Sequence, residues 1–310
     1  MSAPQPPVTR DWLDIVLGAS VTIVMVVVLA LLLVGGRTLD FGYYTTFIGG
    51  RYAAPVYQIL LSAAVVSVGA TVIAFAIGLG LGFLTGWARA LRPRPRRERA
   101  GLHGPPLART LLGAAGRRLS RRLADFYVET MRGTPLLIQV VLLWSILQTA
   151  LPSWDPTVRN LFTGVLAMTI NTGGYQAETF RGGFQAVAPG QVEAAHALGM
   201  TRWLTMRHVV LPQAFRLVIP PLLNEFIALF KASSLLSWIG VIELTKVGKD
   251  LTFVNPHVFE LFLLLTAIYL VVTVPLSRVV SVLEERLRIP GLGVQALPRQ
   301  ARRLRGRATL

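Results

Sequence analysis

The sequence predicts an all-α protein, a polytopic bundle of about six transmembrane helices, and two observations carry that prediction. The first is composition: of the 310 residues, 53% are hydrophobic and only 15% are charged, whereas a soluble domain is about 25% charged. The second is that uncharged stretches, most of them close to the roughly 20 residues needed to cross a bilayer, recur along the chain. The absence of cysteine excludes disulfides and cysteine-ligated metals.

The first uncharged stretch, residues 15–34, is long enough to span the hydrocarbon core. It is longer than the apolar part of a typical cleaved signal peptide, and no A-x-A cleavage site follows it, so it is interpreted as an uncleaved anchor. Residues 37–55 are polar and aromatic, which predicts an external loop. Anchor and loop together define an N-terminal unit over residues 1–56.

The second uncharged stretch, residues 57–88, opens the main transmembrane domain, which is predicted over residues 57–286. Small residues recur in this stretch at every fourth position: Ala70, Ala74, Gly78, Gly82 and Gly86. This spacing places them on one helix face, where another helix backbone can approach closely. The sequence therefore predicts a tightly packed span here.

Four further spans are predicted over residues 133–151, 161–180, 217–230 and 258–277. A basic insert, residues 89–122, separates the second and third spans and holds eleven arginines and one glutamate. A polar loop, residues 181–216, joins the fourth and fifth spans, and residues 231–257 join the fifth and sixth. Residues 287–310 form a basic tail.

The positive charge lies mainly in loops, which indicates membrane topology and argues against a nucleic-acid partner. The net charge is +16, and segments on the side of the predicted N-terminus carry 24 cationic residues against 6 on the opposite side. Because cytoplasmic loops of membrane proteins are enriched in arginine and lysine, both termini are predicted to be cytoplasmic.

The loop 181–216 is more organised than a simple connection between two spans. Pro189 and Gly190 precede a helix-forming run, residues 191–198, and Gly199 follows as a helix C-cap. Ala194, Ala195 and Leu198 give this short helix an apolar face, and Glu193 is expected in its first turn, where the helix dipole favours a carboxylate. Pro212 is expected to end the helical run that follows. The pattern predicts a compact docking element, with Gln191 as its first helical residue.

At these residues the chain resembles a known family. Glu193-Ala194-Ala195, then Gly199, then Leu211-Pro212, resembles the EAA signature of the membrane subunits of prokaryotic ABC importers. Further motifs resemble the subfamily that carries polar amino acids and opines. They are RGTPLL with the following glutamine at residues 132–139, ETFRGG at 178–183, LPQA at 211–214 and NEF at 224–226 before Lys231.

This resemblance implies several partners and places the protein in the inner membrane of a prokaryote. In that family the EAA loop forms a coupling helix that sits in a cleft of a separate ATPase subunit. ATP and magnesium bind to that partner, and this chain is expected to bind no cofactor. A second copy of the permease or a sister permease and an extracytoplasmic solute-binding protein complete the complex. Ala232 departs from the subfamily, which usually has an acidic or amide residue there.

Polar residues inside or at the end of the predicted spans are candidates for the substrate path: Gln139, Asn224, Glu225 and Lys231. An amino-acid substrate needs partners for its ammonium and carboxylate groups. The alternative is that these side chains hydrogen-bond one span to another. Arg132 likewise anchors a span end at the headgroups or pairs with Glu129 or a gate residue.

The basic insert contains a weakly amphipathic run at Leu107, Leu111, Ala115, Leu119 and Leu123. Its arginines either fix the topology or lie on an anionic leaflet. No G-x-x-x-x-G-K-[ST] loop is present, so the chain is not expected to be its own ATPase or an enzyme. The alternative function is a stand-alone secondary transporter or channel, for which Glu225 is the only plausible central charge.

Overall fold

The computed structural model describes residues 47–48, 54–90, 107–254 and 257–287. The predicted first span, most of the basic tail and the first part of the basic insert lie outside these residues. Two compact units divide the chain, Met1–Val56 and Tyr57–Leu310. In the first, β1 (Phe47–Ile48) pairs antiparallel with β2 (Ala54–Pro55). This small ribbon lies within the predicted external loop and departs from the expected all-helical fold.

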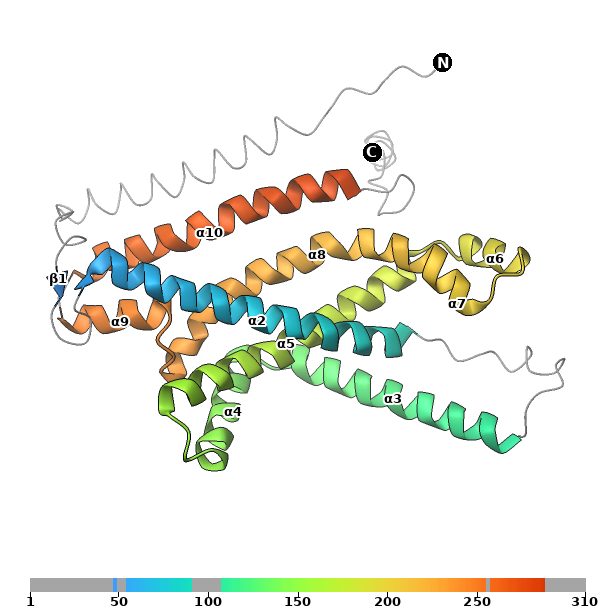
Figure 1. The fold of residues 1–310 in the computed structure, drawn as a ribbon, viewed down its shortest axis with the longest axis horizontal. Helices are drawn as coiled ribbons and strands as arrows, with labels where there is room; N and C mark the ends of the chain where they lie inside the picture. Colours follow the sequence, from blue (N-terminus) through green and yellow to red (C-terminus); the bar gives the residue numbers. More distant parts are fainter. Residues whose placement is uncertain (1–46, 49–53, 91–106, 255–256, 288–310) are drawn as a thin grey trace, which may run out of the picture. The chain divides into compact units, whose positions relative to one another are not determined.

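Every regular element described in the second unit is helical, as the hydropathy pattern predicts (Figure 1). In chain order they are α2 (Val56–Ala90), α3 (Leu107–Gly133), α4 (Leu136–Ala150), α5 (Pro156–Ala186), α6 (Pro189–Ala197), α7 (Arg202–Thr205), the π-helical turn η4 (Met206–Val210), α8 (Leu211–Ala232), the 3₁₀ helix η5 (Ser233–Ile239), α9 (Leu244–Val254) and α10 (Val258–Leu287). In Figure 1, α6 and α7 lie at one end of α5 and α8, and α9 lies at the opposite end beside the start of α2.

Three described helical stretches are long and apolar enough to cross a membrane: Val56–Ala90, Trp203–Ile239 and Val258–Leu287. They contain the predicted second, fifth and sixth spans. A fourth candidate is the bent pair Arg118–Gly133 and Leu136–Ala150, whose two helices meet at 107°. The described residues therefore give three to four candidate spans, fewer than the sequence predicts for the same residues.

The predicted fourth span, residues 161–180, forms the middle of α5 but does not reach the apolar character of the others. The reason is its position inside the bundle. Fourteen of its helix's residues are buried, among them Asn171 and Gln176. A helix surrounded by protein does not need a continuous apolar surface for lipid, so its hydropathy is low although it lies at the core.

Two expectations about helix boundaries are wrong. The insert 89–122 is not entirely a loop, because α3 begins at Leu107 and continues to Gly133. Pro212 does not end a helical run, because it lies in the first turn of α8, directly after η4. The first turn tolerates a proline, which has no N–H to donate. In the π turn before it, the Leu211 N–H donates to the carbonyl of Met206 five residues back.

The small-residue stripe on α2 packs against α5, as its spacing predicts. A Cβ atom added at Gly78 would lie 2.6 Å from Thr172 Cγ2, and one added at Gly82 would lie 2.6 Å from Gln176 Cβ. Gly86 has a similar contact, 2.6 Å from the backbone oxygen of Ala177. These distances leave no room for a side chain, so the two helix backbones touch along this face.

We expect Gly82→Leu to prevent normal packing of α2 on α5, because the added side chain forces the backbones apart at a cost of about 1–3 kcal/mol or more. The measurement is the yield and thermal unfolding temperature of the purified protein in detergent. Gly80→Leu is the matched control, because no atom lies within 4 Å of a Cβ added there. Equal yields and unfolding temperatures for the two variants would contradict the close α2–α5 contact.

Candidate coupling element and polar cluster

Helix α6 is the short helix predicted in the loop between α5 and α8. It begins at Pro189, and the N–H of Gln191 donates to the carbonyl of Ala188 at 3.0 Å. At its end the Gly199 N–H donates to His196 O at 3.0 Å and the Met200 N–H to Ala195 O at 3.1 Å. These are the two bonds of a Schellman motif, which requires a left-handed residue at its C′ position. Gly199 provides it with φ of 78°, so the predicted glycine C-cap is confirmed.

One side of α6 holds it to the protein and the other is exposed. Ala195 is only 4% exposed, and Val192 packs against the buried cluster of Val187, Val210 and Ala214. Leu198 is 84% exposed. Gln191, Glu193 and Ala194 are exposed as well. The helix therefore presents a small apolar and polar surface away from the bundle.

The expected place of Glu193 in the first turn is wrong. Because α6 starts at Pro189, two residues earlier than the sequence reading placed it, Glu193 is the fifth helical residue and the first turn holds no acidic side chain. Its carboxylate lies beyond the reach of the helix N-terminus, where the dipole effect is confined. Its role on the exposed side of α6 is therefore not that of a dipole partner.

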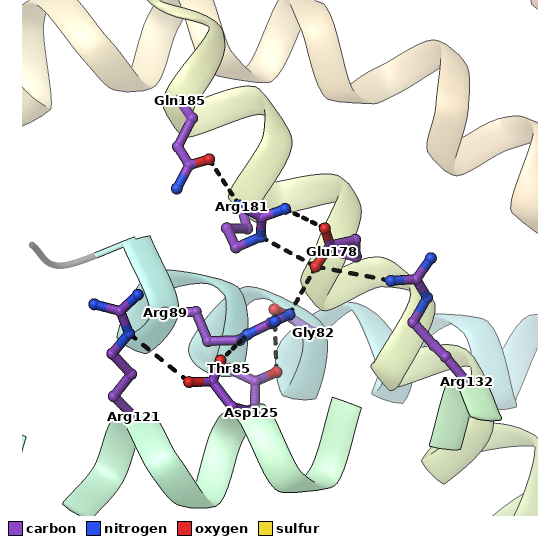
Figure 2. A network of polar contacts seen from close by, with 9 residues as sticks. All are labelled: Gly82, Thr85, Arg89, Arg121, Asp125, Arg132, Glu178, Arg181 and Gln185. Atoms are coloured by element: carbon purple, nitrogen blue, oxygen red, sulfur yellow. Dashed lines mark hydrogen bonds and ion pairs between the residues drawn. The ribbon is translucent and has the colours of Figure 1, made fainter. Parts of the chain in front are cut away.

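A cluster of ion pairs joins α2, α3 and α5, with Glu178 at its centre (Figure 2). Arg89 Nη1 lies 2.7 Å from Glu178 Oε2, and Arg89 Nε lies 2.6 Å from Asp125 Oδ1. Arg181 donates to both oxygens of the Glu178 carboxylate, with Nε 3.0 Å from Oε2. Arg132 Nη1 lies at 3.9 Å from Glu178 Oε2. One carboxylate thus faces three guanidinium groups.

Of the pairings considered for Arg132 from the sequence, the one with Glu129 is not the one found. Arg132 faces Glu178 rather than Glu129, and its guanidinium carbon lies 5.6 Å from the centre of the Tyr175 ring. At this distance a cation–π attraction adds to the ion pair. Sequence reasoning used Glu178 and Arg181 only as parts of a motif and missed the cluster. The i, i+3 spacing of Glu178 and Arg181 on one helix was the sequence signal from which their ion pair could have been predicted.

Glu225 on α8 faces α5. The hydroxyl of Thr179 donates to its Oε1 atom, and its Oε2 atom is buried with no hydrogen-bond partner among the described residues. A buried carboxylate oxygen without a donor is costly unless a ligand or water supplies one.

Asn224 and Lys231 of α8 are exposed and lie seven residues apart, so they share one face of this helix to within roughly 20°. The structure does not bring Lys231 next to Glu225 on that face, since a spacing of six residues places them roughly 120° apart around the helix.

Gln139 lies at the corner between α3 and α4. Its amide nitrogen donates to Met131 O at 3.0 Å and to the Thr134 hydroxyl at 2.6 Å, and its Oε1 atom accepts from Asn171 Nδ2 at 3.0 Å. These bonds hold the bend that follows Gly133 against α5. Gln139 thus bridges helices in this structure, which is one of the two roles considered for it.

Glu243 is a buried residue that sequence reasoning did not single out. Its carboxylate accepts from the backbone N–H of Thr245 at 3.0 Å and of Lys246 at 2.7 Å, so it caps the start of α9. It also accepts from the Ser67 hydroxyl of α2 at 3.2 Å. Burial raises the pKa of Glu243 to about 7, although these hydrogen bonds act in the opposite direction. A glutamate just before a helical stretch was the signal that could have found it.

Comparison with known proteins identifies the family of the chain. The family model described as "Binding-protein-dependent transport system inner membrane component" matches residues 110–289. The glutamine transport system permease protein GlnP of Escherichia coli (strain K12) is 32% identical over 235 residues, which are 76% of this chain and 95% of that protein. The L-cystine transport system permease protein TcyB of Bacillus subtilis (strain 168) is 32% identical over 218 residues, 70% of this chain and 81% of that protein.

A solved structure has the same fold. The one described as "Crystal structure of an amino acid ABC transporter with histidines" is 30% identical, with a TM-score of 0.64 over 81% of this chain and 100% of that one. The chain therefore belongs to the inner-membrane permeases of binding-protein-dependent ABC transporters. Within that class it falls in the polar amino-acid and opine subfamily. It is a multi-pass permease subunit of an ABC amino-acid importer and is itself non-catalytic.

Proposed function

We propose that this chain forms part of the translocation pathway of an ATP-driven importer of polar amino acids, and that α6 couples it to a separate ATPase subunit. The observation that carries the proposal is the Schellman-capped helix α6, which is fixed to the bundle through Ala195 and exposes Ala194 and Leu198. Along the chain, α6 lies between α5 and the consecutive helices α7, η4 and α8, so a displacement of α6 is transmitted to the helices on both sides.

The remaining partners follow from this role. ATP and magnesium bind to the ATPase subunit and not to this chain. An extracytoplasmic solute-binding protein delivers the amino acid, and a second copy of this chain or a sister permease forms the other half of the path. The relatives support polar amino acids as the substrate class, since they include transport-system permeases for glutamine, L-cystine and nopaline.

We assign the polar face of α8 to the path itself. Asn224 and Lys231 are exposed on the same side of this helix, and polar groups facing lipid are costly, so this face borders water or the second permease. Glu225 lies beside Asn224 in the sequence and has a carboxylate oxygen without a described partner, which suits a substrate ammonium group. Gln139 contributes by holding the α3–α4 corner beside that path.

The test of the proposed function is amino-acid uptake into proteoliposomes. We expect uptake only when the ATPase subunit, ATP with magnesium, and the solute-binding protein are all present. ATP hydrolysis should rise when the loaded binding protein is added. Uptake by this chain alone, driven by an ion gradient, would establish the alternative of a stand-alone secondary transporter and overturn the proposal.

The proposed orientation puts α6 in the cytoplasm and the turn between α4 and α5 outside. Because the natural chain has no cysteine, single cysteines report on each side without interference. We expect a membrane-impermeant maleimide to label Trp154→Cys in spheroplasts whose inner membrane is intact, and to label Leu198→Cys only after that membrane is permeabilised. Both positions are exposed in the structure. Labelling of Leu198→Cys in intact spheroplasts would reverse the topology.

A further inference from the structure

Residues 118–126 of α3, a stretch that also contains Arg121 and Asp125 of the ion-pair cluster, carry an exposed apolar arc. Leu119, Leu123 and Phe126 are 59%, 60% and 71% exposed. At about 100° per residue they fall within roughly 60° of one another on the helix surface. Ala124 and Val128, which are buried, lie on the opposite side. This part of α3 therefore packs on the protein with one face and presents a compact apolar arc with the other.

Arginines border this arc. Arg118 and Arg122 are exposed and lie one helical turn apart along one edge of it. Arg121 lies farther round the helix, with its Nε atom 3.8 Å from Asp125 Oδ2. Two acidic residues lie near the same edge: Asp125, which is paired with Arg89 and Arg121, and Glu129, about two turns beyond Arg122. In the sequence, the residues before α3 add Arg92, Arg94, Arg96, Arg97 and Arg99.

We propose that residues 118–126 of α3 form a docking surface for anionic phospholipid, with the apolar arc among the acyl chains and Arg118 and Arg122 on the phosphate groups. A helix with apolar residues on one face and arginines along its edge binds in the plane of a membrane interface, and each basic residue near an anionic leaflet adds to the attraction. Charge complementarity selects an anionic headgroup over a zwitterionic one. This inference does not depend on the coupling role of α6.

The experiment measures which lipid contacts the arc in the intact transporter complex. A bimane label is attached to Leu123→Cys, which is specific because the chain has no other cysteine. The complex is placed in nanodiscs that contain brominated phosphatidylglycerol or, at the same mole fraction, brominated phosphatidylcholine. We expect phosphatidylglycerol to quench the label at least about twofold more, and raising the salt to about 0.5 M to reduce this preference because salt screens exposed charges.

Two comparisons decide the interpretation. Val271→Cys on α10 is the matched control, because Val271 is 72% exposed within an apolar span and should be quenched equally by both lipids. Replacing Arg118 and Arg122 by glutamine should remove the preference at position 123 and leave position 271 unchanged. Equal quenching at position 123 in the unaltered arginine background would show that the insert only anchors the topology. No quenching there by either lipid would show that protein covers the arc. Either result overturns the proposal.

Discussion

The variant Gly199→Asp is expected to reach the membrane at normal abundance and to lose most of its transport. A residue other than glycine at this positive φ costs about 1 kcal/mol, and the new carboxylate lies at the negative end of the α6 dipole, at a further cost of about 0.3–1 kcal/mol. Their sum is at least about the 1.4 kcal/mol that corresponds to a tenfold change in an equilibrium constant. The equilibrium constant for the properly shaped α6 should therefore fall about tenfold, while the bundle stays folded.

The measurement is uptake, together with the ATPase stimulation produced by loaded binding protein, at matched permease abundance. Gly199→Asn is the control, since asparagine tolerates the left-handed conformation better than other non-glycine residues and adds no charge. It should retain much more transport than Gly199→Asp. Normal uptake by Gly199→Asp would refute the coupling role of α6, whereas loss of the protein from the membrane would mean that the loop is needed for folding.

Replacing Glu178 by glutamine is expected to lower the thermal stability of the protein more than any other single neutralisation in the described ion-pair cluster. Glu178 faces Arg89, Arg132 and Arg181, so its loss leaves three cations near one another without the shared anion. Removing one partner of a fully buried pair costs about 3–5 kcal/mol. Since the Glu178 side chain is 27% exposed, we expect about 2 kcal/mol, measured as a lower unfolding temperature in detergent.

Glu129→Gln is the matched control for this variant, because Glu129 is exposed on α3 near the same cluster and should change stability little. A double variant that also carries Arg89→Gln separates the ion pair from general effects. The two substitutions together should cost less than the sum of the single ones, because they remove the same interaction. If the stability losses of the two substitutions are additive, or if Glu178→Gln leaves the unfolding temperature unchanged, the cluster is screened by solvent and does not contribute to the stability of the protein.

The parts of the fold that the sequence predicts well are those governed by local patterns. The four-residue spacing of small residues on α2 and the glycine cap at Gly199 are properties of a single helix, and both are present. The burial of α5 on most of its sides depends on which helices surround it, which no local pattern states. The bend after Gly133 and the passage of α8 through Pro212 likewise depend on tertiary contacts, here Gln139 with Asn171 and the π turn η4.

For the candidate site, too, the sequence predicts local features but not tertiary contacts. The short helix and its glycine cap were predicted from local order in the chain, but the position of Glu193 in the helix was not, because the helix starts two residues earlier than predicted. The cluster around Glu178 joins residues that are up to 89 positions apart in the chain. Their meeting is set by how α2, α3 and α5 pack, so the chain's order alone could not reveal it.

The polar character of α5 has a consequence for how this protein is made. A segment with Asn171, Gln176 and Glu178 in its second half partitions poorly into lipid on its own, because each such group is costly in hydrocarbon before its partners arrive. In the folded protein those partners come from α2, from α3 and from α4. All three helices precede α5 in the chain and are synthesised first. We therefore expect the nascent α5 to leave the insertion machinery together with these helices, so that membrane integration and folding of this core are coupled.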